Sequence, residues 1–163
     1  MTFDDIAERT ARVVRTITIT GTRSISAEDD DRLDVLFDDY LLPFGNAHFY
    51  IGGAAGIDTA TLDWLAENTS ATLTVVVPCT VIDQPQSASS AIASWQGHNR
   101  LAEVIELAAP DLDTSAYHAR NRYMVDRSDF VIGFPRGTDQ TSGTWYTLNY
   151  AADRGKPRLV VPV

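Results

Sequence analysis

Residues 48–68 read HFYIGGAAGIDTATLDWLAEN, and this stretch decides the fold. Strand-forming residues 48–51 are followed by three glycines and two alanines, and then by a helical pattern from about Gly53 to Asn68. Such a turn leaves backbone N–H groups uncovered at the positive end of a helix dipole, which favours an anion. The spacing matches neither the dinucleotide G-x-G-x-x-G motif nor the P-loop. Tight packing of strand on helix without a ligand is the alternative reading.

Short apolar runs alternate with helical patterns along the rest of the chain. This alternation predicts a Rossmann-like α/β fold, which is a doubly wound, mostly parallel sheet of about six strands with helices on both faces. We expect one domain over residues 1–163. The predicted strands are 16–20, 48–51, 73–77, 103–107, 130–134 and 158–161, and the predicted helices are 3–12, 26–41, 53–68, 89–98 (short), 115–126 and 142–154.

Composition limits what the chain can bind. The 163 residues carry a net charge of −9, so the general surface cannot coat nucleic acid, and an anionic ligand needs a local pocket. All basic residues except Lys156 are arginines, which suit bidentate phosphate contacts. Apolar runs are too short to span a membrane, the N-terminus lacks a secretory pattern, and Cys79 has no partner for a disulfide. We therefore expect a cytoplasmic protein without membrane contact.

Gly21, Thr22, Arg23 and Ser24 follow the first predicted strand. Glycine at a strand end allows a tight turn and close approach of a ligand, and the hydroxyls and the arginine can hold phosphate. A plain β-to-α turn with a surface arginine explains the same residues.

Two further motifs point to the same edge of the sheet. Arg120 and Asn121 open the run RNRYMVD, and Ser142, Gly143 and Thr144 begin the last helix, where simple N-capping is the alternative. Ligands of open α/β sheets bind outside the carboxyl ends of the strands, so we expect the motifs to converge there. The predicted nucleotide- or phosphate-binding residues are Gly21, Thr22, Arg23, Ser24, Gly52, Gly53, Ala54, Gly56, Asp58, Arg120, Asn121, Ser142, Gly143 and Thr144.

The sequence contains no motif for metal binding or for a catalytic nucleophile. His48, His98 and His118 lack the spacing of metal ligands, and no G-x-S-x-G elbow is present. We predict no metal site and no cofactor. Asp58 fits two readings, an early-turn residue favoured by the helix dipole or a contact to a ribose or an attacking water.

The ordered set of motifs G-T-R, G-G-A-A-G-I-D, R-N-R-Y-M-V-D and S-G-T-W-Y-T resembles the SLOG superfamily. Within it, residues 16–163 are most similar to DprA/Smf-like (DNA-processing protein A) domains. The resemblance implies that the glycine loops and the Arg120–Asn121 pair line a nucleotide or nucleic-acid phosphate pocket. The LOG phosphoribohydrolases of this superfamily have a glutamate that supports N-glycosidic cleavage, and Thr147 stands at that position here. Threonine cannot act as that acid or base.

Three functions remain open at this point. The favoured one is a nucleotide- or phosphate-binding module without an evident catalytic carboxylate. The second is a nucleotide N-glycosidase that uses Asp58 or Asp126 as a displaced acid/base, so whether the chain is an enzyme stays undecided. The third is a DprA-like oligomer that binds single-stranded DNA. The partners to test are therefore a nucleotide or other phosphate-bearing small molecule, single-stranded DNA and a second copy in a homodimer.

Overall fold

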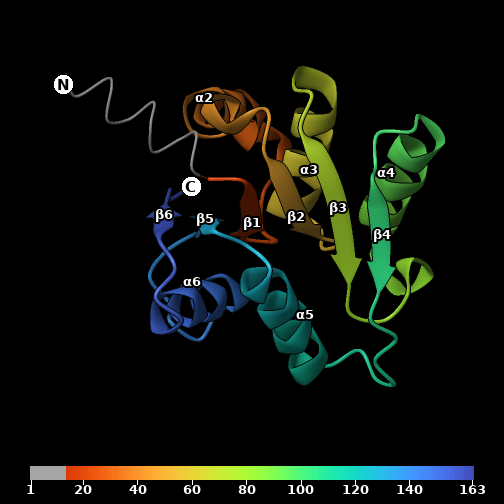
Figure 1. The fold of residues 1–163 in the computed structure, drawn as a ribbon, viewed down its shortest axis with the longest axis vertical. Helices are drawn as coiled ribbons and strands as arrows, with labels where there is room; N and C mark the ends of the chain where they lie inside the picture. Colours follow the sequence, from red (N-terminus) through yellow and green to blue (C-terminus); the bar gives the residue numbers. More distant parts are fainter. Residues whose placement is uncertain (1–13) are drawn as a thin grey trace.

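The computed structural model describes residues 14–163 and shows a six-stranded sheet in the order β4-β3-β2-β1-β5-β6 (Figure 1). All neighbouring strands are parallel, which confirms the predicted doubly wound α/β fold. The predicted helix 3–12 lies outside the described residues. The strands are β1 (Thr16–Gly21), β2 (His48–Gly52), β3 (Thr72–Val77), β4 (Glu103–Glu106), β5 (Phe130–Phe134) and β6 (Arg158–Val160).

Helices cover both faces of the sheet (Figure 1). One face packs against α2 (Asp30–Tyr40), α3 (Ile57–Asn68) and α4 (Gln86–Gly97), and the other against α5 (Thr114–Asp126) and α6 (Gly143–Asp153). Three short 3-10 helices are η1 (Ala27–Asp29), η2 (Leu42–Phe44) and η3 (Val81–Asp83). Within residues 14–163 no helix combines the length and the apolar character that crossing a membrane requires.

The two cores follow from strand alternation. On β1, Ile17 and Ile19 point to the α2–α4 side, where they join Phe37 in the larger apolar cluster. On β5, Val131 points to the opposite side and packs against Val125 and α6. This division fixes α5 and α6 next to the carboxyl ends of β1 and β5.

Three helices differ from the sequence prediction. The predicted helix 26–41 is divided into η1 and α2, which begins at Asp30. α3 begins at Ile57 rather than near Gly53, because Gly56 has a φ of 78° and interrupts the helical backbone. α4 is a full helix of 12 residues, although its sequence shows no firm period. Ala88 and Ile92, four residues apart, are its buried contacts and place it against the sheet.

The strand order reverses between β1 and β5. From β1 the chain adds β2, β3 and β4 outward on one side, and then returns to place β5 and β6 on the other side. The helices that leave β1 and β5 therefore lie on opposite faces, which opens a crevice outside the carboxyl ends of these two strands.

Candidate functional site

A cavity of about 430 Å³ lies at this reversal point. Its walls come from the end of β1 and the following turn, from α5, and from the loop that leads from β5 into α6. Most of the predicted binding residues meet here although they are spread over the whole sequence. Those that line the cavity are Gly21, Thr22, Arg23, Ala54, Asp58, Arg120, Asn121, Ser142, Gly143 and Thr144.

The glycines of the loop after β2 shape the cavity from behind and do not line it. A side chain at Gly52 would overlap the Arg120 guanidinium and the Asp58 carboxylate, and one at Gly56 would overlap the backbone of Thr22 and Arg23. A Cβ at Gly53 would likewise lie only 2.5 Å from a methyl group of Val77. These three glycines permit close packing of neighbouring segments.

Donors in this glycine loop are partly used inside the protein. The Ala54 N–H donates to Asp58 Oδ2 over 3.2 Å, and the Ile57 N–H donates to the Thr22 carbonyl over 3.0 Å. Ser24, the remaining predicted residue, lies outside the cavity lining, and its N–H donates to Thr22 Oγ1. The start of α3 therefore offers a ligand fewer free N–H groups than the sequence pattern indicates.

The start of α6 is open. Ser142 caps this helix of 11 residues by accepting the Trp145 N–H over 3.3 Å. The backbone N–H groups of Gly143 and Thr144 find no acceptor among residues 14–163, and a Cβ at Gly143 would meet nothing within 4 Å. Two donors at a helix N-terminus thus face the cavity, which is the geometry that binds anions.

Arg23 and Arg120 flank the ring of Tyr117. The exposed Arg23 guanidinium lies 4.3 Å from the ring centroid and the Arg120 guanidinium 5.9 Å from it. Arg120 is only 3% exposed and donates to Asn121 Oδ1 over 2.7 Å and to the Val76 carbonyl over 3.3 Å. Burial lowers the pKa of Arg120, and the nearby Asp58 opposes this shift. Arg120 is therefore a fixed, desolvated cation, whereas Arg23 has an exposed side chain.

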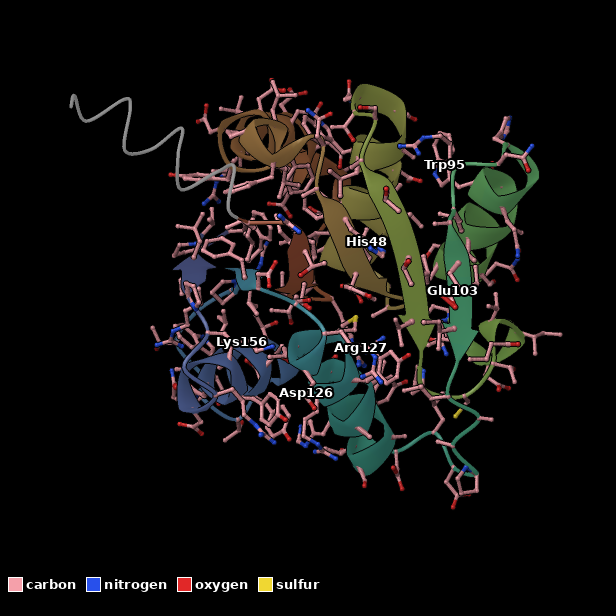
Figure 2. The ribbon with its side chains drawn as sticks, in the orientation of Figure 1. His48, Trp95, Glu103, Asp126, Arg127 and Lys156 are labelled. Carbon is pink, nitrogen blue, oxygen red and sulfur yellow. The ribbon has the colours of Figure 1, made fainter. Side chains whose placement is uncertain are left out.

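Asp58 is the acidic residue of the cavity lining and is 7% exposed. Burial raises its pKa, and Arg120, the Ala54 N–H and Arg23 oppose the shift in that order. Asp126, the other candidate acid, is the last residue of α5 (labelled in Figure 2); it is not part of the cavity lining and accepts the Tyr150 hydroxyl. The buried Thr147 donates its hydroxyl to the Gly143 carbonyl. Of the candidate acids, the geometry leaves Asp58 alone at the cavity.

The structure adds residues that the motif search missed. Thr114, Tyr117, His118 and Met124 line the cavity from the same face of α5 as Asn121. Their spacing of three, four or seven residues from Asn121 is the sequence signal that would have found them. Arg122, which belongs to the same motif, is absent from the lining and donates to the Tyr146 hydroxyl over 2.7 Å.

His118 is held by a ring stack. Its imidazole lies parallel to the Tyr146 ring, with 3.6 Å between the ring centroids. Burial and the charge of Arg122 both lower the pKa of His118, so the ring is neutral at pH 7. His118 and Tyr117 thus present aromatic rings to the cavity.

Arg136 is the third arginine of the lining and comes two residues after the end of β5. The cavity lining contains one carboxylate, that of Asp58. Its positive groups are Arg23, Arg120, Arg136 and the open N-terminus of α6. The balance in the cavity is positive although the chain is acidic. Among residues 14–163, no three His, Cys, Asp or Glu side chains gather as metal ligands.

Comparisons with known proteins bear on the family and the fold. The family model for DNA recombination-mediator protein A matches residues 7–163. A search of the curated proteins finds no match. Among solved structures, DNA processing protein A from Helicobacter pylori has a TM-score of 0.65 at 21% identity, and its coverage is 95% of this chain and 68% of that chain. That structure was described for its unique single-stranded DNA binding mode.

The DprA structure from Streptococcus pneumoniae has a TM-score of 0.69 at 19% identity. The match covers 91% of this chain and 50% of that chain, so the present chain spans about half the length of that protein. At these identities the two structures show a shared fold.

Proposed function

The chain belongs to the DNA recombination-mediator protein A family, and on that basis we propose that it binds single-stranded DNA by holding a backbone phosphate in the cavity between β1 and β5. The observation that carries this proposal is the meeting of three arginines with the open N-terminus of α6 in one cavity. The single-stranded DNA binding described for the Helicobacter pylori protein supports it.

The donors suit a phosphate group. Arg23 and Arg136 have exposed side chains that can reach a ligand, while the N–H groups of Gly143 and Thr144 are fixed by the helix. Charge-assisted hydrogen bonds from guanidinium groups and from helix N-termini are the usual protein contacts to nucleic-acid phosphates. Contacts of this kind do not depend on base sequence.

A single strand fits this site better than a duplex. The positive charge is confined to a concave cavity of about 430 Å³, and the chain as a whole carries −9. A flexible strand can place one phosphate and its neighbouring base in such a cavity, whereas a rigid duplex needs a longer basic surface. Tyr117 and His118 offer rings on which a base can stack.

The test is fluorescence anisotropy with a labelled oligothymidylate in low-salt buffer. We expect Arg23→Ala and Arg136→Ala each to weaken binding about tenfold, because each removes a hydrogen bond from a charged group. Arg127→Ala is the matched control, since Arg127 also stacks on a tyrosine, Tyr123, but at the opposite end of α5. Equal affinities for all three variants and the wild type would refute the proposal.

Binding of a free nucleotide is the second candidate. The cavity volume is within the range of small-molecule sites, roughly 300–1,000 Å³. Thymidine monophosphate is the probe in a competition experiment with the labelled oligonucleotide. If the mononucleotide displaces the oligonucleotide at an equal nucleotide concentration, the site serves a nucleotide, and if a large excess is needed, the strand is the ligand.

A further inference from the structure

Asp29 forms an ion pair with Arg136 at the edge of the cavity. We infer that Asp29 competes with the bound phosphate for the Arg136 guanidinium. By occupying Arg136, Asp29 lowers the affinity of the site for phosphate. This inference rests on the proposed function, and it means that a residue of the protein itself weakens phosphate binding at that site.

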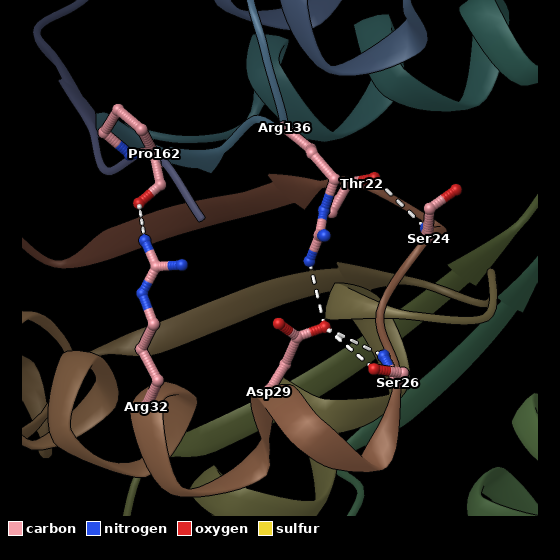
Figure 3. A network of polar contacts seen from close by, with 7 residues as sticks. All are labelled: Thr22, Ser24, Ser26, Asp29, Arg32, Arg136 and Pro162. Carbon is pink, nitrogen blue, oxygen red and sulfur yellow. Dashed lines mark hydrogen bonds and ion pairs between the residues drawn. The ribbon is translucent and has the colours of Figure 1, made fainter.

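The pair joins two distant parts of the chain (Figure 3). Arg136 Nη2 donates to Asp29 Oδ2 over 2.9 Å, and the two side chains are 44% and 20% exposed. Asp29 is the last residue of η1, and Arg136 lies in the loop between β5 and α6. Among residues 14–163, neither Arg23 nor Arg120 has a carboxylate oxygen within 4 Å of its guanidinium nitrogens. Arg136 is therefore the cavity arginine that an ion pair holds in place.

The geometry favours exchange of the partner. The same Asp29 oxygen also accepts the Ser26 N–H over 2.9 Å, which closes the start of η1 (Figure 3). Asp29 therefore keeps a hydrogen-bonded place when Arg136 leaves it. The Arg136 side chain extends from an exposed loop, and a backbone phosphate, which carries one negative charge on two free oxygens, can replace the Asp29 carboxylate as its acceptor. A ligand phosphate can thus take Arg136 over without disturbing the helix start.

Competition has a consequence for selectivity. A ligand has to replace the existing Arg136–Asp29 bond before it gains the full contact. An anion that contacts Arg136 alone exchanges one similar interaction for another, whereas a phosphate held also by Arg23 and the α6 amides gains more than it displaces. Asp29 therefore filters for phosphates that engage several donors at once.

The decisive variant is Asp29→Asn, which removes the charge and keeps an oxygen for the Ser26 N–H. We expect it to bind labelled oligothymidylate roughly three- to fivefold more tightly than the wild type, which is the size of effect an exposed ion pair produces. Asp39→Asn is the matched control, because it removes the same charge from an exposed position of α2. The control should bind like the wild type.

A double variant separates competition from general repulsion. In an Arg136→Ala background, Asp29→Asn should change the affinity no more than Asp39→Asn does. Asp29→Ser, which shortens the side chain away from Arg136, should reproduce the gain, and thermal unfolding confirms that each variant is folded. Unchanged or weaker binding by folded Asp29→Asn, while Arg136→Ala still loses affinity, would overturn the inference and leave the proposed function standing. If Arg23→Ala and Arg136→Ala bind like the wild type, the proposed function fails and the inference falls with it.

Discussion

At position 52 the absence of a side chain lets two buried charged groups reach the same stretch of backbone. The Arg120 guanidinium and the Asp58 carboxylate fill the space where a Cβ would lie. This close approach fixes Arg120 at the cavity, so Gly52 acts on the site without touching a ligand. The glycine signature thus has a steric meaning at this position.

Gly52→Ala should therefore damage both stability and binding. Because the added methyl group collides with two polar side chains in a filled space, we expect a loss of about 1–3 kcal/mol in the free energy of unfolding. DNA affinity should fall as well, because Arg120 moves. Denaturant unfolding and anisotropy measure the two effects. Gly97→Ala is the control, since a Cβ there meets nothing within 4 Å and should leave both quantities nearly unchanged.

His118 predicts an acid dependence of stability. Its pKa in the folded protein lies below 6.5, because of burial first and Arg122 second, so the unfolded chain binds the proton more readily. Stability is therefore fully present above about pH 6.5 and falls as the pH drops through that value towards the lower folded pKa.

His118→Phe should remove part of this dependence. Melting temperatures between about pH 7 and about pH 5.5 should fall less steeply for the variant than for the wild type. The slope will not vanish, because burial also lowers the pKa of His48, while Glu103 opposes that shift. His98→Phe changes an exposed histidine at the end of α4 and is the control. Identical slopes for wild type and His118→Phe would contradict the prediction.

Among the elements, α5 has an end that is closed by one side chain from outside the helix. Lys156 Nζ donates to the carbonyls of Val125, Asp126 and Ser128 over 2.6, 3.1 and 2.7 Å. These carbonyls belong to the last turn of α5 and the residues after it, where a cation is also favoured by the helix dipole. The single lysine of the sequence thus anchors the helix that carries Tyr117, His118 and Arg120.

Lys156→Met should lower the free energy of unfolding by about 1–3 kcal/mol, because it removes charge-assisted hydrogen bonds and leaves carbonyls unpaired. Since Lys156 is not part of the cavity lining, the affinity of folded protein for DNA should stay within a factor of about two. Arg154→Met is the control, because Arg154 is exposed and lies 5.1 Å above the Tyr150 ring. A control as unstable as Lys156→Met would show that general charge, and not the cap, is responsible.

The sequence predicts the strands well because most of them are short β-branched or apolar runs, although β4 (Glu103–Glu106) has a glutamate at each end. α4 was harder, since Ala88 and Ile92 are its only fully buried residues and the rest of the helix is small and polar. Single motifs in the sequence indicate Arg23 and Gly143, and both residues line the cavity. Arg136 was not predicted as a site residue, because it belongs to no motif and only the strand order brings it to the cavity. The hydrogen bond from the Ile57 N–H to the Thr22 carbonyl could not be predicted from the sequence, since it depends on the packing of two loops.

For the whole molecule, the contrast between a net charge of −9 and a small positive cavity decides how binding responds to salt. Each phosphate neutralised on a single strand contributes about −0.7 to the slope of log K against log salt. Even if each of the three cavity arginines neutralised its own phosphate, the slope would be no steeper than about −2, and Arg136→Ala should make it shallower by at most about 0.7. Anisotropy titrations over a salt series give this slope. A value near −5 would mean that a broad surface, and not the cavity, binds the strand.

The reversal of strand order also governs when the site comes into existence. β1 is the first strand of the described chain, and its neighbour β5 pairs with it through contacts such as Ile17 with Phe130. Pairs so distant in sequence close slowly, and domains fold only after such partners have been synthesised. A growing chain that ends before β5 already holds the β1–β4 side of the sheet but lacks Arg136 and the start of α6. If the cavity binds DNA as proposed, this ability arises only after the two halves of the sheet have joined.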